Sequence, residues 1–196
     1  AGVYPMGDDD PVVWMERETR GHLPRHLLRL AAFRIGCFPV TNAEWACFMT
    51  AGGYEDARWW DTAAGRAWRE GRGTAAGIHA DIREWLARFR SRPEFLGELV
   101  SSGQLDDEAG ERWRRRLAMT EAELGRHLLE TYPERRLAEP RFWRDERFNA
   151  PSQPVVGICW YEARAYCAWL SAASGEAFDL PTEAQWEAAA RGEQAR

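Results

Sequence analysis

Hydrophobic and polar positions alternate over short runs in the first third of the chain. The runs Pro11–Met15, His26–Leu30 and Phe33–Cys37 have the length of strands and are bounded by turn residues. The segment Thr41-Asn-Ala-Glu44 then has the spacing of a capping box, in which the Thr hydroxyl and the Glu carboxylate satisfy free N–H groups. The pattern predicts strands followed by a helix that ends near Thr50, before Gly52-Gly53.

The middle of the chain has a helical period. Pro93 suits the first turn of one of its helices. Apolar residues recur at helical spacing, with charged residues between them, at Ile78, Ile82, Trp85, Leu86 and Phe89, at Phe95, Leu96, Leu99 and Val100, and at Trp113, Leu117, Leu124 and Leu128. We interpret residues 58–140 as a helical insertion, and we expect the helices of 78–130 to bury their apolar faces against one another.

Residues 141–196 return to mixed structure. The run Val155–Cys159 has strand length, and a helix should follow it and end at Gly175. Glu162 and Glu183 fit helix-start positions near the positive end of the dipole. A last helix is expected to begin at the capping box Thr182-Glu-Ala-Gln185 and to point Trp186 and Ala189 inward. The pattern therefore predicts an α+β fold in three parts, 1–57, 58–140 and 141–196.

Composition narrows the classes of function. Of the 196 residues, 45% are hydrophobic and 29% are charged, which is typical of a globular chain with a real core. The net charge of −5 argues against a nucleic-acid binder, although all 26 basic residues are Arg. A run of about 18 apolar residues, as a membrane span requires, does not occur. The 11 Trp residues predict either a core with polar contacts or an aromatic-lined cleft.

Candidate metal ligands and nucleophiles do not form a recognisable motif. His22 and His26 are four residues apart, but Pro24 lies between them, and His79 and His127 stand alone. The triplet Asp8–Asp10 lacks the Gly and the distal Glu of a calcium loop, so a solvated acidic turn is the better interpretation. The four cysteines, Cys37, Cys47, Cys159 and Cys167, show no C-x-x-C spacing. We interpret them as buried free thiols, with a disulfide as the alternative, and we expect no bound metal.

Several segments, in this order, carry a family resemblance. They are Met6-Gly7, Pro24-Arg-His26, Phe33-Arg-Ile-Gly36, Pro39-Val-Thr-Asn-Ala-Glu-Trp45, Pro154-Val-Val-Gly-Ile-Cys-Trp-Tyr-Glu-Ala163, Ala165-Tyr-Cys-Ala-Trp-Leu170 and Leu180-Pro-Thr-Glu-Ala-Gln-Trp-Glu187. Together they resemble the formylglycine-generating enzyme (sulfatase-modifying factor) family. The longer helical middle is similar to versions in multidomain bacterial proteins and in variable proteins of diversity-generating retroelements.

This resemblance implies a C-type-lectin-like fold. Catalytic members oxidise a substrate cysteine with copper held by two cysteines late in the domain, and the family also has calcium sites. Those later segments are not found in these residues, so we expect the C-terminal part of the domain to be missing, and none of the four cysteines is assigned to copper. Two positions depart from the family pattern, because Asp179 stands where Arg is usual and Cys159 where Ser is usual. The first puts any family-type ion pair there in doubt.

Three functions follow from these patterns. The favoured one is a non-catalytic module that binds a protein or a small molecule, with no cofactor in this chain and no nucleic acid or membrane as partner. The alternative is a copper-dependent formylglycine-generating oxidase whose catalytic cysteines lie outside this chain, and the third is a purely structural fragment. The sequence identifies neither the ligand-binding residues nor the ligand. The cysteine pattern leaves the compartment open, with the cytoplasm slightly favoured.

Overall fold

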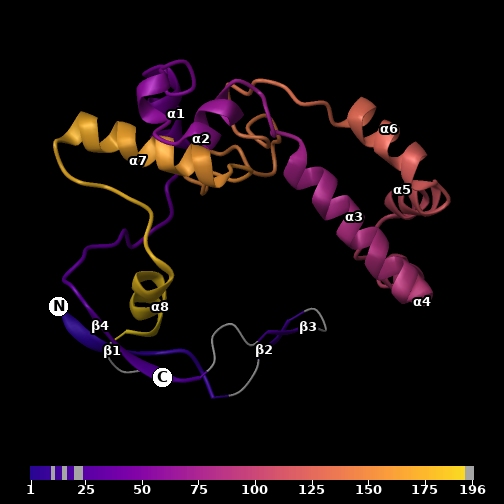
Figure 1. Cartoon of the computed structure of the whole chain (residues 1–196), viewed down its shortest axis with the longest axis horizontal. Helices are drawn as coiled ribbons and strands as arrows, with labels where there is room; N and C mark the ends of the chain where they lie inside the picture. Colours follow the sequence, from indigo (N-terminus) through magenta and orange to yellow (C-terminus); the bar gives the residue numbers. More distant parts are fainter. Residues whose placement is uncertain (10–11, 15–16, 20–23, 193–196) are drawn as a thin grey trace. The chain divides into compact units, whose positions relative to one another are not determined.

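A computed structural model describes residues 1–9, 12–14, 17–19 and 24–192 of the chain. Its strands are β1 (Gly2–Met6), β2 (Val12–Trp14), β3 (Arg17–Thr19) and β4 (His26–Leu30). A 3₁₀ turn, η1, covers Ala57–Trp59. The helices are α1 (Asn42–Thr50), α2 (Ala63–Arg69), α3 (Ala76–Ser91), α4 (Pro93–Ser101), α5 (Asp107–Leu117), α6 (Glu121–Thr131), α7 (Trp160–Ser174) and α8 (Glu183–Arg191) (Figure 1). This mixture of helices with small antiparallel sheets is compatible with the predicted α+β class.

The chain divides into two compact units. Unit 1 contains residues 1–51 and 141–196, and unit 2 contains residues 52–140. Unit 2 thus begins at Gly52, whereas the sequence placed the start of the helical part at residue 58. The interpretation of residues 58–140 as an insertion stays a prediction.

Unit 1 holds a two-stranded antiparallel ribbon. Strand β1 pairs with β4, and the register places Met6 opposite His26 and Gly2 opposite Leu30. Helix α8 packs against both strands (Figure 1), and Met6 of β1 is buried. The other sheet, of β2 and β3, is also two-stranded. The strand predicted at His26–Leu30 is confirmed.

Two other predicted strands are wrong. Phe33–Cys37 has no strand partner and is largely exposed, so the alternation there has no backbone ladder to stabilise it. Val155–Cys159 is not a strand either, because Gly157 has φ +74° in the middle of the run. An isolated antiparallel bridge joins Thr41 to Pro154, just before this run.

The helix starts follow the sequence signals closely. Thr41 and Glu44 form the predicted capping box, and the Glu44 carboxylate accepts a bond of 2.7 Å from the Thr41 N–H. These bonds from Thr41 hold the pKa of Glu44 below its usual value. The box at Thr182 and Gln185 is also present. The predicted orientation of the last helix is wrong, because Trp186 is 62% exposed and Ala188 is the buried residue of α8.

Unit 2 has its own hydrophobic core. Ile82, Leu86, Leu124 and Leu128 are buried together from α3 and α6. Trp113 and Leu117 of α5 pack against them, along with Ile78, Met119 and Tyr132. The prediction that these helices bury their faces against one another is confirmed. A second group, Tyr54, Trp60 and Trp68, stacks near the start of the unit, with 5.6 Å between the centroids of the two Trp rings.

Candidate functional site

An aromatic cluster fixes α7 against α1 in unit 1. Tyr166 stacks on Trp45 with ring centroids 5.0 Å apart and also meets Phe48 edge to face at 5.8 Å. Trp169 contacts Phe48 and Tyr166 from the next turn of α7. Trp45 and Phe48 are almost completely buried. Because aromatic rings in such contacts have few alternative arrangements, the surface of α7 turned away from α1 is held in a defined position.

One buried side chain at the N-terminus of α1 is hydrogen-bonded to the loop that contains residues 148–153. The Asn42 amide donates hydrogen bonds of 2.7 Å and 2.9 Å to the carbonyls of Phe148 and Ala150. Asn42 is 4% exposed, and its backbone N–H donates to the Gln153 carbonyl at 2.9 Å. Asn42 therefore joins α1 to residues that follow it by more than a hundred positions.

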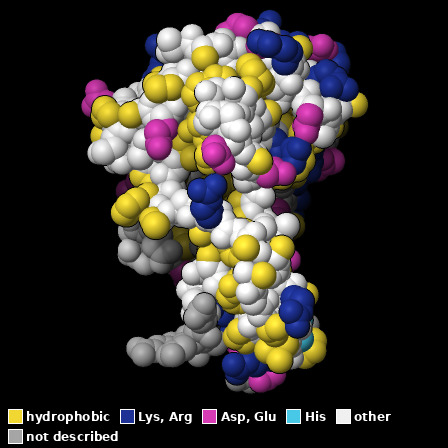
Figure 2. Space-filling model, turned by 90° about the vertical axis from the view of Figure 1, so that its left-hand side faces the viewer, with side chains coloured by type: hydrophobic (Ala, Val, Ile, Leu, Met, Phe, Trp, Pro, Cys, Tyr) yellow, Lys and Arg dark blue, Asp and Glu magenta, His cyan; other side chains and the backbone are white. Residues whose placement is uncertain are grey.

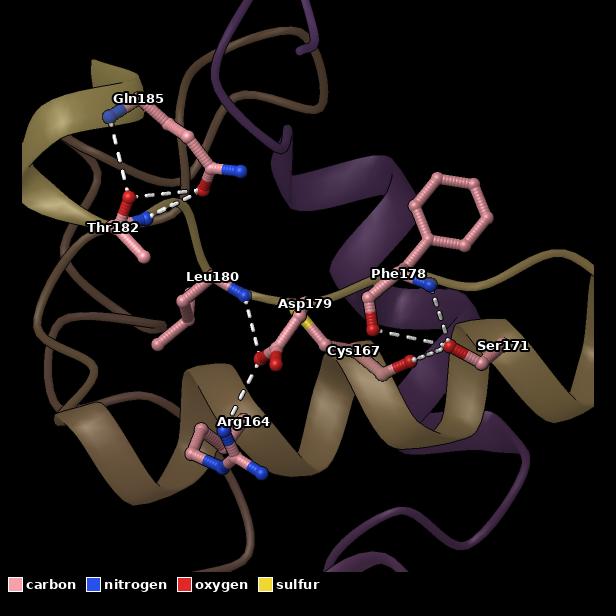
Figure 3. Close-up of polar contacts among 8 residues, drawn as sticks. All are labelled: Arg164, Cys167, Ser171, Phe178, Asp179, Leu180, Thr182 and Gln185. Carbon is pink, nitrogen blue, oxygen red and sulfur yellow. Dashed lines mark hydrogen bonds and ion pairs between the residues drawn. The ribbon is translucent and has the colours of Figure 1, made fainter. Parts of the chain in front are cut away.

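The segment after α7 returns along that helix and is bonded to it. The Ser171 hydroxyl accepts a hydrogen bond of 2.9 Å from the Phe178 N–H and donates one of 2.8 Å to the Cys167 carbonyl (Figure 3). One residue further, Asp179 accepts from the Leu180 N–H at 2.8 Å. The backbone of Phe178 is thus positioned by a hydrogen bond, while the residue is 46% exposed.

An ion pair links this segment to the first turns of α7. The Arg164 guanidinium lies 3.1 Å from Asp179 and 5.3 Å from the centroid of the Trp160 ring (Figure 3). The departure of Asp179 from the family pattern had put an ion pair here in doubt. The structure has one, in which α7 provides the cation and the loop provides the anion. We call Trp160, Arg164, Phe178 and Asp179 the α7 surface.

Reversing the charge of Asp179 should weaken this attachment slightly. In Asp179→Arg two guanidinium groups would face each other, and since the pair is partly exposed we expect a loss of about 0.5–1 kcal/mol, or a fall of about 1–4 °C in Tm. Thermal unfolding followed by circular dichroism measures this. Asp81→Arg, an equal charge change at an exposed site of α3, is the control. Adding Arg164→Asp should recover the loss, and a Tm that ignores Asp179→Arg would contradict the ion pair.

Two segments 180 residues apart meet at the ribbon. The Glu187 carboxylate of α8 accepts a bond of 2.8 Å from the Gly7 N–H, just after β1, and is also paired with Arg191 at 2.9 Å. The same helix leaves Trp186 exposed, and the ribbon leaves Leu27 (72%) and Val3 (51%) exposed. Figure 2 shows hydrophobic side chains at the surface in the lower part of the view, where α8 and the ribbon lie. Unit 1 thus carries large apolar side chains that its described residues do not cover.

The candidate metal ligands are not brought together. His22 and Asp10 lie outside the described residues. His26 bonds the Pro24 carbonyl, His79 bonds carbonyls at the end of α6, and His127 lies beside Thr131. Asp8 accepts from the Asp9 N–H, as in an exposed acidic turn. Among the residues that the structure describes, no three His, Cys, Asp or Glu side chains are grouped as metal ligands would be.

The cysteines differ in burial. All four are free thiols, but the prediction that they are buried is wrong for Cys37 and Cys47, which are exposed, whereas Cys159 and Cys167 are half-buried. Burial raises the pKa of Cys159 to about 12, with a further contribution from the charge of Glu162, and burial also raises the pKa of Cys167. Glu162 accepts from the Cys159 N–H at 2.7 Å, as expected of a helix-start residue.

Alkylation should separate the two pairs of cysteines. With iodoacetamide at about pH 8, we expect Cys37 and Cys47 to be modified first and Cys159 and Cys167 much more slowly, because the thiolate is the reacting species and the buried thiols stay protonated. Peptide mass spectrometry over time measures the order. Denatured protein is the control, in which all four should react at similar rates. Fast labelling of Cys159 in the folded chain would contradict the assigned burial.

Comparison with known proteins identifies the family. The model of the sulfatase-modifying factor enzyme 1-like domain matches residues 1–85 and 107–196, so the chain belongs to this family. The residues left unmatched, 86–106, include the end of α3 and all of α4. The resemblance that the sequence suggested is confirmed.

Relatives include both enzymes and a protein named as inactive. The hercynine oxygenase of Mycolicibacterium thermoresistibile is 29% identical over 85% of this chain and 24% of its own length. The formylglycine-generating enzyme of Streptomyces coelicolor is 29% identical over 97% of this chain and 45% of its own length. The inactive C-alpha-formylglycine-generating enzyme 2 of Bos taurus is 54% identical over 97% of this chain and 46% of its own length. The chain therefore spans a quarter to a half of these relatives. No solved structure matches it.

The donors present do not fit a copper site of the kind that the family implies. Copper ligation by cysteine needs deprotonated thiols that converge. Burial raises the pKa of Cys159 and of Cys167, which disfavours their thiolate forms, and in the described part of the chain none of the four cysteines belongs to a group of three candidate ligands. The four thiols of this chain are therefore assigned no part in copper chemistry.

Among the described residues, no helix has both the length and the apolar character needed to cross a bilayer.

Sequence reasoning missed most residues of the site. The roles of Arg164, Asn42 and Glu187 depend on partners distant in sequence, and no local spacing indicates them. Trp160 carried a usable signal, because it stands at the first position of a helix in which Tyr166 and Trp169 lie on a different face.

Proposed function

We propose that this chain is a binding module, without catalytic residues of its own, built on the scaffold of the formylglycine-generating enzyme family. The observation that carries the proposal is the α7 surface, where Trp160 is 54% and Phe178 46% exposed, although Trp160 belongs to helix α7 and hydrogen bonds hold the backbone at Phe178 and Leu180. Exposed aromatic side chains on a rigid support lose little conformational entropy on binding. A protein or a small molecule with apolar groups is the ligand that such a surface suits.

The finer fold is part of the same proposal. We infer a C-type-lectin-like scaffold in which further polypeptide covers the open face of the β1–β4 ribbon. Support comes from the exposure of Val3 and Leu27, since a two-stranded ribbon with one uncovered apolar face is only marginally stable in water. We propose that such a module is a retroelement variable protein or a sensor domain of a larger protein.

Peptide selection tests the binding role. A library of random twelve-residue peptides displayed on phage is selected on the immobilised 196-residue chain, and the recovered peptides are measured by titration against variants. We expect Trp160→Ala to weaken binding at least about tenfold, as truncation of a central aromatic does. Leu129→Ala, which removes an equally accessible apolar side chain from unit 2, is the control and should change nothing. Failure to enrich any peptide, or equal binding by both variants, would reject the proposed surface.

A second candidate function is a copper-dependent formylglycine-generating oxidase that acts on a substrate cysteine. The relatives named formylglycine-generating enzyme and hercynine oxygenase favour it. In that case the catalytic cysteines belong to residues outside this chain, because its own thiols do not fit copper. Both functions therefore expect no copper in the 196 residues alone. They differ in whether a longer protein that includes the catalytic cysteines oxidises the cysteine of a substrate peptide when it is loaded with copper.

Elemental analysis tests the expectation that the two functions share. For the purified chain we expect less than about 0.1 copper, iron or zinc per molecule, since the described residues group no three His, Cys, Asp or Glu side chains and no cysteine of this chain is assigned to copper. Copper(I) added under reducing conditions should likewise be removed by a mild chelator. One metal per chain, lost when His22 and His26 or the cysteines are replaced, would contradict this expectation.

A further inference from the structure

One arginine of unit 2 is buried without an acidic partner among the described residues. Arg116, near the end of α5, is 9% exposed and lies at the border of the core formed by α3, α5 and α6. Its neighbours on the same helix behave differently, because Arg112 is paired with Glu108 at 2.8 Å and Arg114 is paired with Glu111. Removing a cation from water is costly unless an anion or several hydrogen bonds compensate it.

The compensation that Arg116 receives is small. Its Nη2 donates one hydrogen bond of 2.9 Å to the Tyr132 hydroxyl, and its guanidinium lies 5.1 Å from the Trp113 ring centroid and 5.9 Å from that of Tyr132. A guanidinium has five N–H donors, so most of its capacity is unused within the described residues. Neither Nε nor Nη1 is among the fully buried, unpartnered side-chain atoms of the described residues. The donors thus lie beside two aromatic rings with most of their capacity unused.

We propose that Arg116 binds a carboxylate, from an organic acid or a peptide, with an aromatic or aliphatic group that packs on Trp113 and Tyr132. A planar fork of N–H donors matches the two oxygens of a carboxylate, and charge-assisted hydrogen bonds are stronger where water is partly excluded. The two rings provide an apolar contact directly beside the charge. The site lies in unit 2 and does not depend on the α7 surface.

Nuclear magnetic resonance of labelled arginine tests this site. The full chain is prepared with ¹⁵N in its Arg side chains, and the Nε–H signals are followed while sodium benzoate, sodium acetate or sodium phosphate is added at constant ionic strength. We expect a saturable shift of the Arg116 signal with benzoate, and binding of acetate about fivefold weaker because acetate lacks the ring contact. Tyr132→Phe identifies the signal, since it removes the hydrogen bond to Nη2 and leaves the cation in place.

Variants provide the controls. Arg116→Lys keeps the charge but loses the planar fork, so benzoate should bind about tenfold more weakly, whereas Arg115→Lys, at an exposed position next to it, should have no effect. If Arg116→Lys does not fold, the titration of Tyr132→Phe still reports on the site. A response to phosphate without one to benzoate, or no saturable shift with any of the three anions, would overturn the proposal.

Discussion

Replacing Leu128 by alanine will lower the stability of unit 2 by about 2–5 kcal/mol. Leu128 is completely buried against Ile82, Leu86 and Leu124, and deletion of its side chain removes apolar contacts and leaves a cavity that the packed helices cannot close. Urea unfolding followed by circular dichroism measures the loss. Hydrogen exchange with mass spectrometry should show lower protection throughout α3 and α6, because these helices share the core.

The neighbouring residue is a matched control. Leu129 is 62% exposed, so Leu129→Ala should change the free energy of unfolding by less than about 0.5 kcal/mol. The two variants remove the same atoms from adjacent positions of one helix and differ only in burial. Equal losses for both would mean that α6 does not pack as the structure has it.

Local signals in the sequence were sufficient for the helices. Thr41 and Thr182 each cap a helix with a Glu or Gln three residues later, and this pattern depends on nothing distant. The apolar spacing of α3 and α6 also predicted their shared core. The predictions succeeded where the information was contained within a few turns of chain.

Strands and surface orientation were harder to predict. Phe33–Cys37 alternates as a strand would, yet a strand exists only if a partner provides hydrogen bonds, and that partner cannot be read from the run itself. The orientation of Trp186 failed for a related reason. Helix α8 uses Ala188 and Glu187 toward the ribbon, and the size of Trp186 suggested burial that its position on the helix does not give.

The candidate site was predictable only in part. Of the α7 surface, the sequence had singled out Trp160, within a quoted segment, and Asp179, as a departure from the family pattern. The pairing of Asp179 with Arg164 is a contact made by folding. Arg116 did carry a signal. It lies three residues after Trp113 and one before Leu117, close to the apolar face of α5, and a charged residue at such a place suggests either a buried partner or a ligand.

Replacing Asn42 by aspartate is expected to have the largest effect on unit 1. The substitution changes one NH₂ group into an oxygen, so two donated hydrogen bonds are lost and a carboxylate faces the carbonyls of Phe148 and Ala150. At neutral pH we expect a loss of about 3–5 kcal/mol, since an uncompensated charge is left in a buried position. Hydrogen exchange should show the loss of protection in α1 and residues 148–155, and not in unit 2.

The pH dependence of Asn42→Asp identifies the cause of that loss. Burial beside two carbonyl oxygens raises the pKa of the introduced carboxyl in the folded chain above its unfolded value, so the destabilisation is largest at neutral pH and shrinks as the pH falls through the folded pKa. The protonated carboxyl can donate one of the two hydrogen bonds again. Urea unfolding at about pH 7 and pH 4.5 measures the difference, with Asn149→Asp at an exposed position of the same loop as the control. A loss that is the same at both values would mean that Asn42 acts by shape alone and that its amide does not hold the loop.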